Sequence, residues 1–252
     1  MSPKFISSSL LILTFAVSIT AATCHTSPPP PPSADPPTQY IVAVDLSTSM
    51  GAPARADHEK LLHALVDNLD FGDQLILLKV HENGVKSGVA MKSITAPALT
   101  SPKPTAGKKN ALRLTRQTAN LYVSTLFKGD PVVGSDILAT LHTAANLAAG
   151  SGDSSRTELL ILSDMLHCTA KPVCMDPPRN IPDSSWIEAR KQQGLIRPLD
   201  HVCISVVGAD DSTLEGVRVR EFWRRYFQAA GADFDPERYV HTAPPTGIAR
   251  CS

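Results

Sequence analysis

Short apolar runs alternate with amphipathic segments along most of the chain. The runs at 40–44, 75–80, 158–162 and 202–207 carry apolar side chains at nearly every position. Such runs are typical of strands that are buried on both faces of a parallel sheet. Segment 54–69 instead spaces its apolar side chains at helical intervals. This alternation predicts an α/β fold: a doubly wound, mostly parallel sheet with helices on both faces.

The other predicted elements complete this sheet. Residues 85–94 follow the hairpin signal Asn83-Gly84, so they predict an antiparallel strand at the sheet edge. Residues 239–241 predict a short last strand. Further helices are expected at 110–127, 135–149, 184–193 and 212–230, with Ser184 as the N-cap of the third and Phe222, Tyr226 and Phe227 as apolar anchors of the fourth.

The first residues of the chain have the pattern of an export signal. An apolar stretch at 10–19 is too short to span a bilayer, and small residues and Cys24 follow it. We therefore predict a signal peptide at 1–23. The position of Cys24 resembles the lipobox of bacterial lipoproteins, although Thr23 departs from that pattern. The alternative is ordinary cleavage after Ala22.

A proline-rich segment follows and is expected to be an extended tether. We assign residues 24–38 to the lipidated cysteine and this tether, and residues 39–252 to one folded domain. A lipid on Cys24 would anchor that domain to a membrane. The expected location is the periplasm or the cell surface, with attachment to the outer membrane.

Charge composition narrows the class of partner. The chain has 24 Lys plus Arg and 24 Asp plus Glu, so no excess of positive charge indicates nucleic acid as a partner. After the signal segment, no second apolar stretch is long enough to span a membrane.

The cysteine count agrees with export. Of five cysteines, Cys24 is the candidate for lipidation, which leaves an even number for disulfide bonds. Cys168 and Cys174 enclose a short loop and are the first candidates for a pair. Cys203 and Cys251 could form a second bridge, whereas the alternative for Cys203 is a buried free thiol.

Oxygen-bearing side chains follow two of the predicted strands. Asp45, Ser47 and Ser49 come directly after the first strand, and Asp164 follows the strand at 158–162. Ser135 opens a predicted helix. Because the carboxyl ends of parallel strands form the binding edge of such a sheet, we expect these five residues to meet there. Carboxylates and hydroxyls suit a hard divalent cation.

The residues and their order resemble the von Willebrand factor A domain with its metal-ion-dependent adhesion site. The family motif Asp-x-Ser-x-Ser matches Asp45, Ser47 and Ser49. Its later threonine matches Ser135, which keeps the hydroxyl, and its second aspartate matches Asp164. The resemblance spans roughly residues 39–241, so the predicted domain is of this type. The cysteine-containing loop after Asp164 looks like an insertion that could reshape the rim of the site.

This resemblance implies a binding protein rather than an enzyme. The implied cofactor is Mg²⁺, with Mn²⁺ or Ca²⁺ as alternatives, held by Asp45, Ser47, Ser49, Ser135 and Asp164. Because few negative charges reach the ion, it would accept a carboxylate from a partner protein that presents an Asp or Glu. The expected function is metal-dependent adhesion or complex assembly.

Three other interpretations stay open at this point. Each serine could simply cap a helix. The domain could be a metal-dependent hydrolase or phosphoryl-transfer enzyme, although no nucleophile motif surrounds His58, His63 or His167. Finally, the ion could have a purely structural role, in which it stabilises the fold and binds no partner.

Overall fold

The computed structural model divides into two compact units, residues 1–34 and 35–252. It describes residues 36–81, 89–101, 103–151, 155–169, 174–175 and 180–243, which all belong to the second unit. The predicted signal peptide, Cys24 and most of the tether lie outside the described residues, so the predicted division into three parts stays a prediction. No helix among the described residues is long and apolar enough to cross a membrane.

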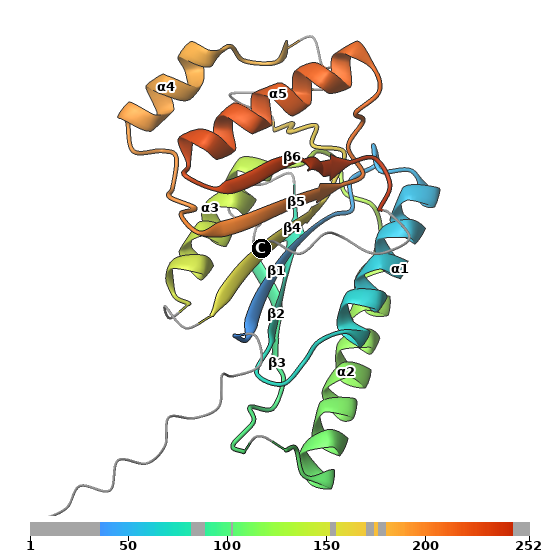
Figure 1. Cartoon of the computed structure of the whole chain (residues 1–252). Coiled ribbons are helices and arrows are strands. Elements are labelled where there is room, and N and C mark those ends of the chain that lie inside the picture. The colour runs from blue at the N-terminus through green and yellow to red at the C-terminus, as the bar shows by residue number, and fades with distance from the viewer. Residues whose placement is uncertain are drawn as a thin grey trace, which may run out of the picture. The chain divides into compact units, whose positions relative to one another are not determined.

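Six strands and five helices alternate along the described part of the second unit (Figure 1). In chain order they are β1 (Thr38–Asp45), α1 (Ala52–Asp67), β2 (Gln74–Val80), β3 (Val89–Thr95), α2 (Ala106–Phe127), α3 (Ile137–Ala149), β4 (Arg156–Leu162), α4 (Ser184–Gln192), β5 (Val202–Val207), α5 (Leu214–Ala229) and β6 (Asp233–Val240).

The strands form one sheet in the order β3-β2-β1-β4-β5-β6. All neighbouring pairs are parallel except β2 and β3, which are antiparallel at the edge. The predicted α/β fold is therefore confirmed. The strand that follows β1 in the chain, β2, lies on one side of the central pair β1 and β4, whereas the strand that follows β4, β5, lies on the other side. The two central strands thus form a switch point, where parallel α/β sheets bind ligands at their carboxyl ends.

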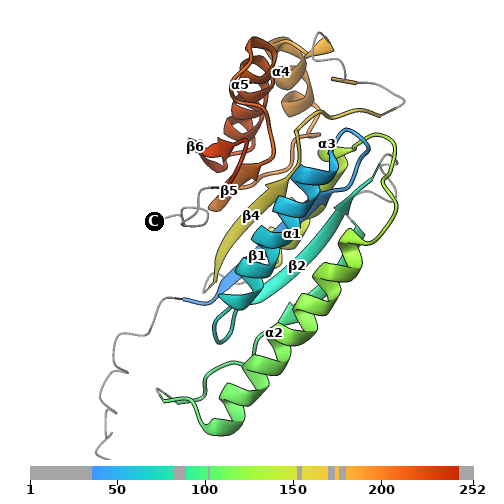
Figure 2. The same cartoon turned by 90° about the vertical axis from the view of Figure 1, so that its right-hand side faces the viewer.

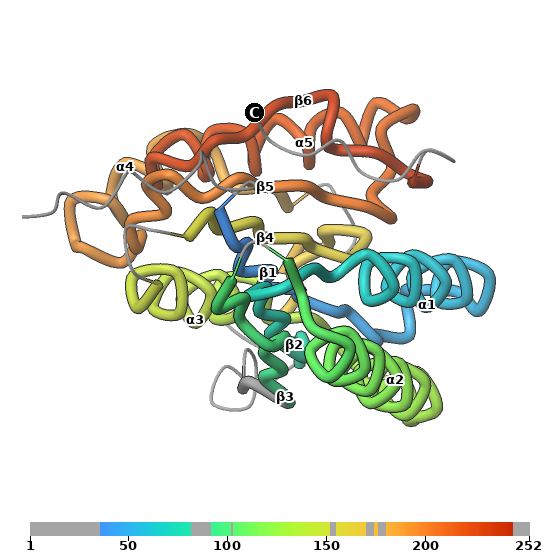
Figure 3. Tube along the Cα trace, turned by 60° about the horizontal axis from the view of Figure 1, so that its bottom comes forward, coloured from blue at the N-terminus to red at the C-terminus, as the bar shows by residue number. Residues whose placement is uncertain are grey.

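The two faces of the sheet bury separate apolar clusters. On β1, Val42 and Val44 pack with the cluster that includes Leu62 of α1, while Ile41 and Ala43 pack with the cluster of α3, α4 and α5. Figure 2 shows α1 and α2 running along one side of the strands, and Figure 3 shows α3 on the opposite side. Burial on both faces explains why these strands carry no polar alternation.

Aromatic side chains of α5 fill the second cluster. The predicted anchors Phe222, Tyr226 and Phe227 are buried there, together with Trp223, which is fully buried. The Trp223 indole nitrogen donates a hydrogen bond to the carbonyl of Met165 at 2.9 Å, so this helix also fixes the chain that follows β4.

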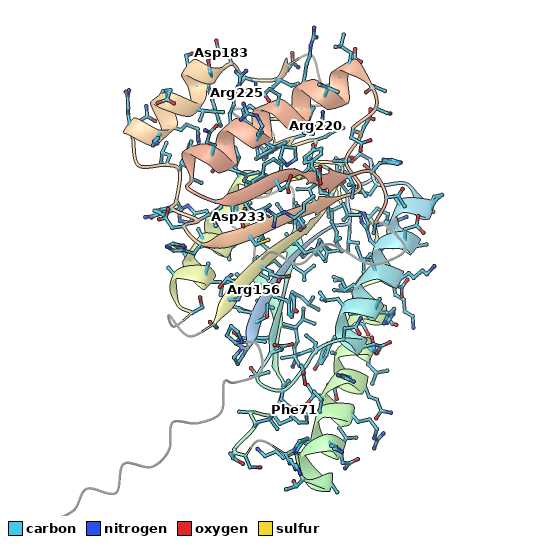
Figure 4. The ribbon with its side chains drawn as sticks, viewed as in Figure 1. Phe71, Arg156, Asp183, Arg220, Arg225 and Asp233 are labelled. Atoms are coloured by element: carbon cyan, nitrogen blue, oxygen red, sulfur yellow. A yellow bond between two sulfur atoms is a disulfide. The ribbon has the colours of Figure 1, made fainter. Side chains whose placement is uncertain are left out.

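Several predicted boundaries differ from the structure for local reasons. Asp183, labelled in Figure 4, caps α4 in place of Ser184, because its carboxylate accepts from the Trp186 N–H. Helix α2 begins four residues earlier than predicted, behind the N-cap Thr105. Strand β6 is longer than predicted, and its Pro236 is tolerated because β6 is an edge strand. The predicted Asn83-Gly84 turn lies outside the described residues.

A buried leucine of α1 and an exposed leucine of α2 allow a direct test of this packing. Leu62 is fully buried, whereas Leu121 of α2 is 71% exposed. We expect Leu62→Ala to lower the free energy of unfolding by about 2–5 kcal/mol. The control Leu121→Ala should stay within about 0.5 kcal/mol of the wild type. Urea denaturation measures both, and equal losses in the two variants would contradict this assignment of the core.

Candidate metal centre

The carboxylate of Asp45 lies fully buried at the end of β1. Its Oδ1 accepts hydrogen bonds from the Ser47 N–H at 2.9 Å and from the Ser135 hydroxyl at 3.0 Å. Its Oδ2 accepts from the Ser163 hydroxyl at 2.7 Å. Donors from three separate loops thus meet on one carboxylate.

The two serines of the first loop stand side by side. The Oγ atoms of Ser47 and Ser49 are 2.8 Å apart, and Ser47 is buried whereas Ser49 is exposed. The Asp-x-Ser-x-Ser spacing therefore leads from the buried carboxylate to the surface. Each hydroxyl retains lone pairs that can face a cation.

A neighbouring loop holds this first loop in place. The Thr48 N–H donates to the carbonyl of Val132 at 2.9 Å, and the Val132 N–H donates to the carbonyl of Leu46 at 3.1 Å. This short parallel pairing links the two segments only three residues before Ser135.

Ser135 is positioned by backbone contacts on both sides. Gly134 precedes it with a φ of 78°, a left-handed conformation that glycine adopts without strain. Ser135 and Cys168 exchange two backbone hydrogen bonds, each of 2.9 Å. Sequence reasoning also assigned Ser135 a capping role, and this was wrong. Asp136 caps α3 by accepting from the Ala139 N–H, so the Ser135 hydroxyl remains available to Asp45.

The loop that follows Asp164 contains the predicted disulfide. Cys168 and Cys174 are bonded to each other. This loop contributes directly to the site, because Cys168 is the residue paired with Ser135. Cys203 is also disulfide-bonded. Its predicted partner Cys251 lies outside the described residues, as does Cys24.

Asp164 is the fifth predicted residue of the site. It is partly buried, and it lines a cleft of about 320 Å³ together with Ser49. Its Oδ1 accepts from the Leu166 N–H at 3.0 Å. Met165, the next residue, has a φ of 63°, which is an uncommon conformation for a residue other than glycine and is often found at functional sites.

Ser163 is a site residue that the sequence motif did not reveal. It is fully buried and donates to Asp45 Oδ2. The parallel register pairs Val44 with Leu162, so Asp45 and Ser163 are the next residues on two adjacent strands. The apolar runs at 40–44 and 158–162 contain the signal that could have revealed this contact. If the two runs are aligned at their carboxyl ends, the first polar residues after them, Asp45 and Ser163, lie side by side.

The electrostatics of Asp45 suit a bound cation. Burial raises the pKa of its carboxyl, while hydrogen bonds from Ser163, Ser47 and Ser135 partly oppose that shift. Within the described ranges, no Lys, Arg or His side chain forms an ion pair with Asp45. An unpaired charge buried among hydroxyl oxygens is costly, and a divalent cation would offset that cost.

Hydroxyl oxygens are necessary members of any ion site at this edge. In the described part of the chain, no three His, Cys, Asp or Glu side chains are grouped so that they could hold a metal ion. The predicted set has two carboxylates and three hydroxyls, so its donor chemistry fits a hard cation rather than zinc or copper.

Comparison with known proteins returns similar folds but no close relative. No protein-family model and no curated protein matches the chain. Among solved structures, the chain is similar to a von Willebrand factor type A protein from Catenulispora acidiphila, with 13% identity and a TM-score of 0.44 over 80% of this chain and 40% of that chain. It is also similar to the pilus adhesin SpaC from Lactobacillus rhamnosus GG, with 13% identity and a TM-score of 0.47 over 82% and 28% of the two chains.

A third similar structure is described with a metal at its adhesion site. It is the proximal thread matrix protein 1 of the mussel byssus with a zinc-occupied MIDAS motif, at 14% identity and a TM-score of 0.34 over 73% of this chain and 41% of that chain. The mostly parallel sheet with its antiparallel edge strand is the type of sheet that the sequence predicted. The chain has a doubly wound, mostly parallel α/β fold.

The similarity extends no further than the fold. The chain covers 40%, 28% and 41% of the lengths of these three solved chains. At such low identities, no residue role and no partner carries over to this domain.

The histidines have structural positions near the site. His58 of α1 is buried, and His167 is buried with its Nδ1 accepting from the Ile137 N–H at 3.2 Å. His63 contacts Asn120 and Ser124 of α2, so it links two helices. Gly208, which has a φ of 106°, leaves room for His58, because a Cβ there would lie 2.7 Å from the imidazole Nε2.

Burial of His58 and His167 predicts a loss of stability in acid. Burial lowers the pKa of each from 6.5 to about 4. Between these values the unfolded chain binds protons that the folded chain does not, so stability falls as the pH drops from about 6.5 to about 4. Each histidine accounts for up to about 3 kcal/mol of the free energy of unfolding that is lost over this pH range. Urea denaturation across this pH range measures the free energy of unfolding. His58→Leu should make that free energy depend less on pH, and an unchanged pH dependence would contradict the lowered pKa of His58.

Alanine substitutions of Ser163 and Ser49 should lower the free energy of unfolding by different amounts. Ser163→Ala leaves the buried Asp45 Oδ2 without its donor, which should cost about 1–3 kcal/mol in the free energy of unfolding. Ser49→Ala changes an exposed hydroxyl and should cost less than about 0.5 kcal/mol. The comparison is made by urea denaturation in EDTA, and equal costs would show that the Ser163 contact is not stabilising.

Proposed function

We propose that this domain binds a partner protein through a divalent metal ion at the carboxyl edge of its sheet. The observation that supports the proposal is the fully buried Asp45 carboxylate, which has hydroxyl donors around it and no ion pair with a cationic side chain of the described residues. Asp45, Ser47, Ser49, Ser135 and Asp164 would hold the ion, with Mg²⁺ the first choice and Mn²⁺ or Ca²⁺ as alternatives.

The partner should present an acidic side chain. When bound, the ion would supply a positive centre that attracts a carboxylate from outside the domain. Exposed Ser49 and the cleft beside Asp164 would form the contact surface around it. The buried serines Ser47, Ser135 and Ser163 keep the Asp45 carboxylate fixed before either the ion or the partner arrives. Such preorganisation lowers the ordering cost of binding.

The cellular setting is part of the same proposal. The signal-like segment at 1–23 and the proline-rich tether would place the domain outside the cytoplasm, anchored by a lipid on Cys24. The Cys168–Cys174 bond supports an oxidising compartment. In that setting we propose a role in adhesion or in the assembly of an envelope complex, without catalysis.

Metal binding is tested by thermal or urea unfolding in Mg²⁺ and in EDTA. The wild-type chain should gain about 2.7 kcal/mol in unfolding free energy at about 100 times its dissociation constant for Mg²⁺. Asp45→Ala should abolish that gain. The control Asp235→Ala removes an exposed carboxylate of β6 and should retain it. No gain in the wild type with Mg²⁺, Mn²⁺ or Ca²⁺ would refute the proposed site.

Partner binding then separates the possible roles of the ion. Envelope extract is passed over the immobilised wild type and Asp45→Ala, each with Mg²⁺ and with EDTA. A protein retained only by the wild type with Mg²⁺ supports the proposal. Metal-dependent stability without any such protein would leave the ion a structural role only. Metal-dependent turnover in a hydrolase screen would instead show an enzyme.

A further inference from the structure

A second cavity lies on the face of the sheet covered by α3, α4 and α5, and Asp136 in its lining is the neighbour of Ser135. Its volume is about 380 Å³. Its polar lining comes from α3 and its N-cap, from the loop after β4, from α4 and from α5, and consists of Asp136, His142, Thr143, His167, Thr169, Arg190 and Tyr226. It shares no lining residue with the cleft beside Asp164.

Arg190 brings a positive charge to this cavity without an acceptor. Its guanidinium lies over the ring of Trp186, 4.6 Å from the ring centroid. Its Nε is buried and has no hydrogen-bond partner, and within the described chain Arg190 forms no ion pair. Buried donors are nearly always satisfied in native structures, so an acceptor from outside is expected here.

Tyr226 provides a second unpartnered donor. The residue is only 4% exposed, and its hydroxyl makes no hydrogen bond to any described residue. Burial raises the pKa of its phenol to about 12, while the nearby charge of Arg190 acts in the opposite direction. The phenol is therefore protonated at neutral pH and can donate a hydrogen bond.

We propose that this cavity binds a small monocarboxylate, with Arg190 and Tyr226 as its donors. The planar guanidinium matches a carboxylate through two parallel hydrogen bonds. Asp136 in the lining adds a negative charge, which disfavours a doubly charged anion such as phosphate. The side chains of Leu138, Ala139 and Leu195 line the rest of the cavity and suit a short apolar body behind the carboxylate.

The inference does not depend on the proposed metal-dependent function. Carboxylates would also bind a metal ion at the Asp45 centre, so the experiment is done in EDTA. Acetate, butyrate and phosphate are each titrated into the full-length chain at constant ionic strength. The readout is the indole N–H signal of Trp186 in nitrogen-edited NMR spectra, because this ring stacks on Arg190.

Two variants and one control identify the donors. Butyrate should shift the Trp186 signal saturably and bind more tightly than acetate, whereas phosphate should bind at least about tenfold more weakly than butyrate. Arg190→Gln should weaken butyrate binding by about tenfold or more, and Tyr226→Phe by roughly threefold. Lys191→Gln, a neighbour on α4 that does not line this cavity, should bind as the wild type does.

Several outcomes would overturn the proposal. No saturable shift with butyrate would show that the cavity binds no carboxylate. Equal binding in Arg190→Gln and the wild type, with both chains folded by their spectra, would remove Arg190 from the site. Phosphate binding as tight as that of butyrate would mean that the cavity accepts anions by charge alone.

Discussion

The structure at the working edge of this domain depends on one buried carboxylate. A charge placed in the interior loses its hydration, and only hydrogen bonds or an opposite charge can replace it. Asp45 receives donors from its own loop, from Ser135 and from Ser163. These three segments lie far apart in the sequence. Each must therefore reach its place before the end of β1 can be buried, and this requirement defines how the loops of the edge are arranged.

The sheet determines which residues can meet this requirement. Because β1 and β4 are adjacent and parallel, the residues that follow them leave the sheet side by side. The neighbours Ser135 and Asp136 then divide their roles. Asp136 caps α3 and also lines the cavity of Arg190, whereas the Ser135 hydroxyl turns toward Asp45. A single turn of chain thus contributes to two separate polar environments.

The sequence was sufficient for the sheet, because the sheet depends on strong local patterns. Fully apolar runs indicated strands buried on two faces, and a polar motif directly after such a run indicated the binding edge. Contacts that depend on pairing between distant segments were not visible. Ser163 needed the register of β4 against β1, and Asp183 could be told from Ser184 as a cap only by backbone geometry. Strand β6, with its charged side chains and Pro236, lacks a strand pattern because it is an edge strand.

The cysteine loop has a consequence for the order in which the domain matures. Its disulfide closes a short loop, and the backbone of Cys168 in that loop is hydrogen-bonded twice to Ser135. Oxidation of the cysteines and the position of the Ser135 hydroxyl are thereby linked through one isolated antiparallel bridge. A chain whose thiols are still reduced lacks the cross-link that restrains this loop. The Cys168–Cys174 bond therefore restrains the segment that is hydrogen-bonded to Ser135, so that thiol oxidation adds to the rigidity of the centre around Asp45.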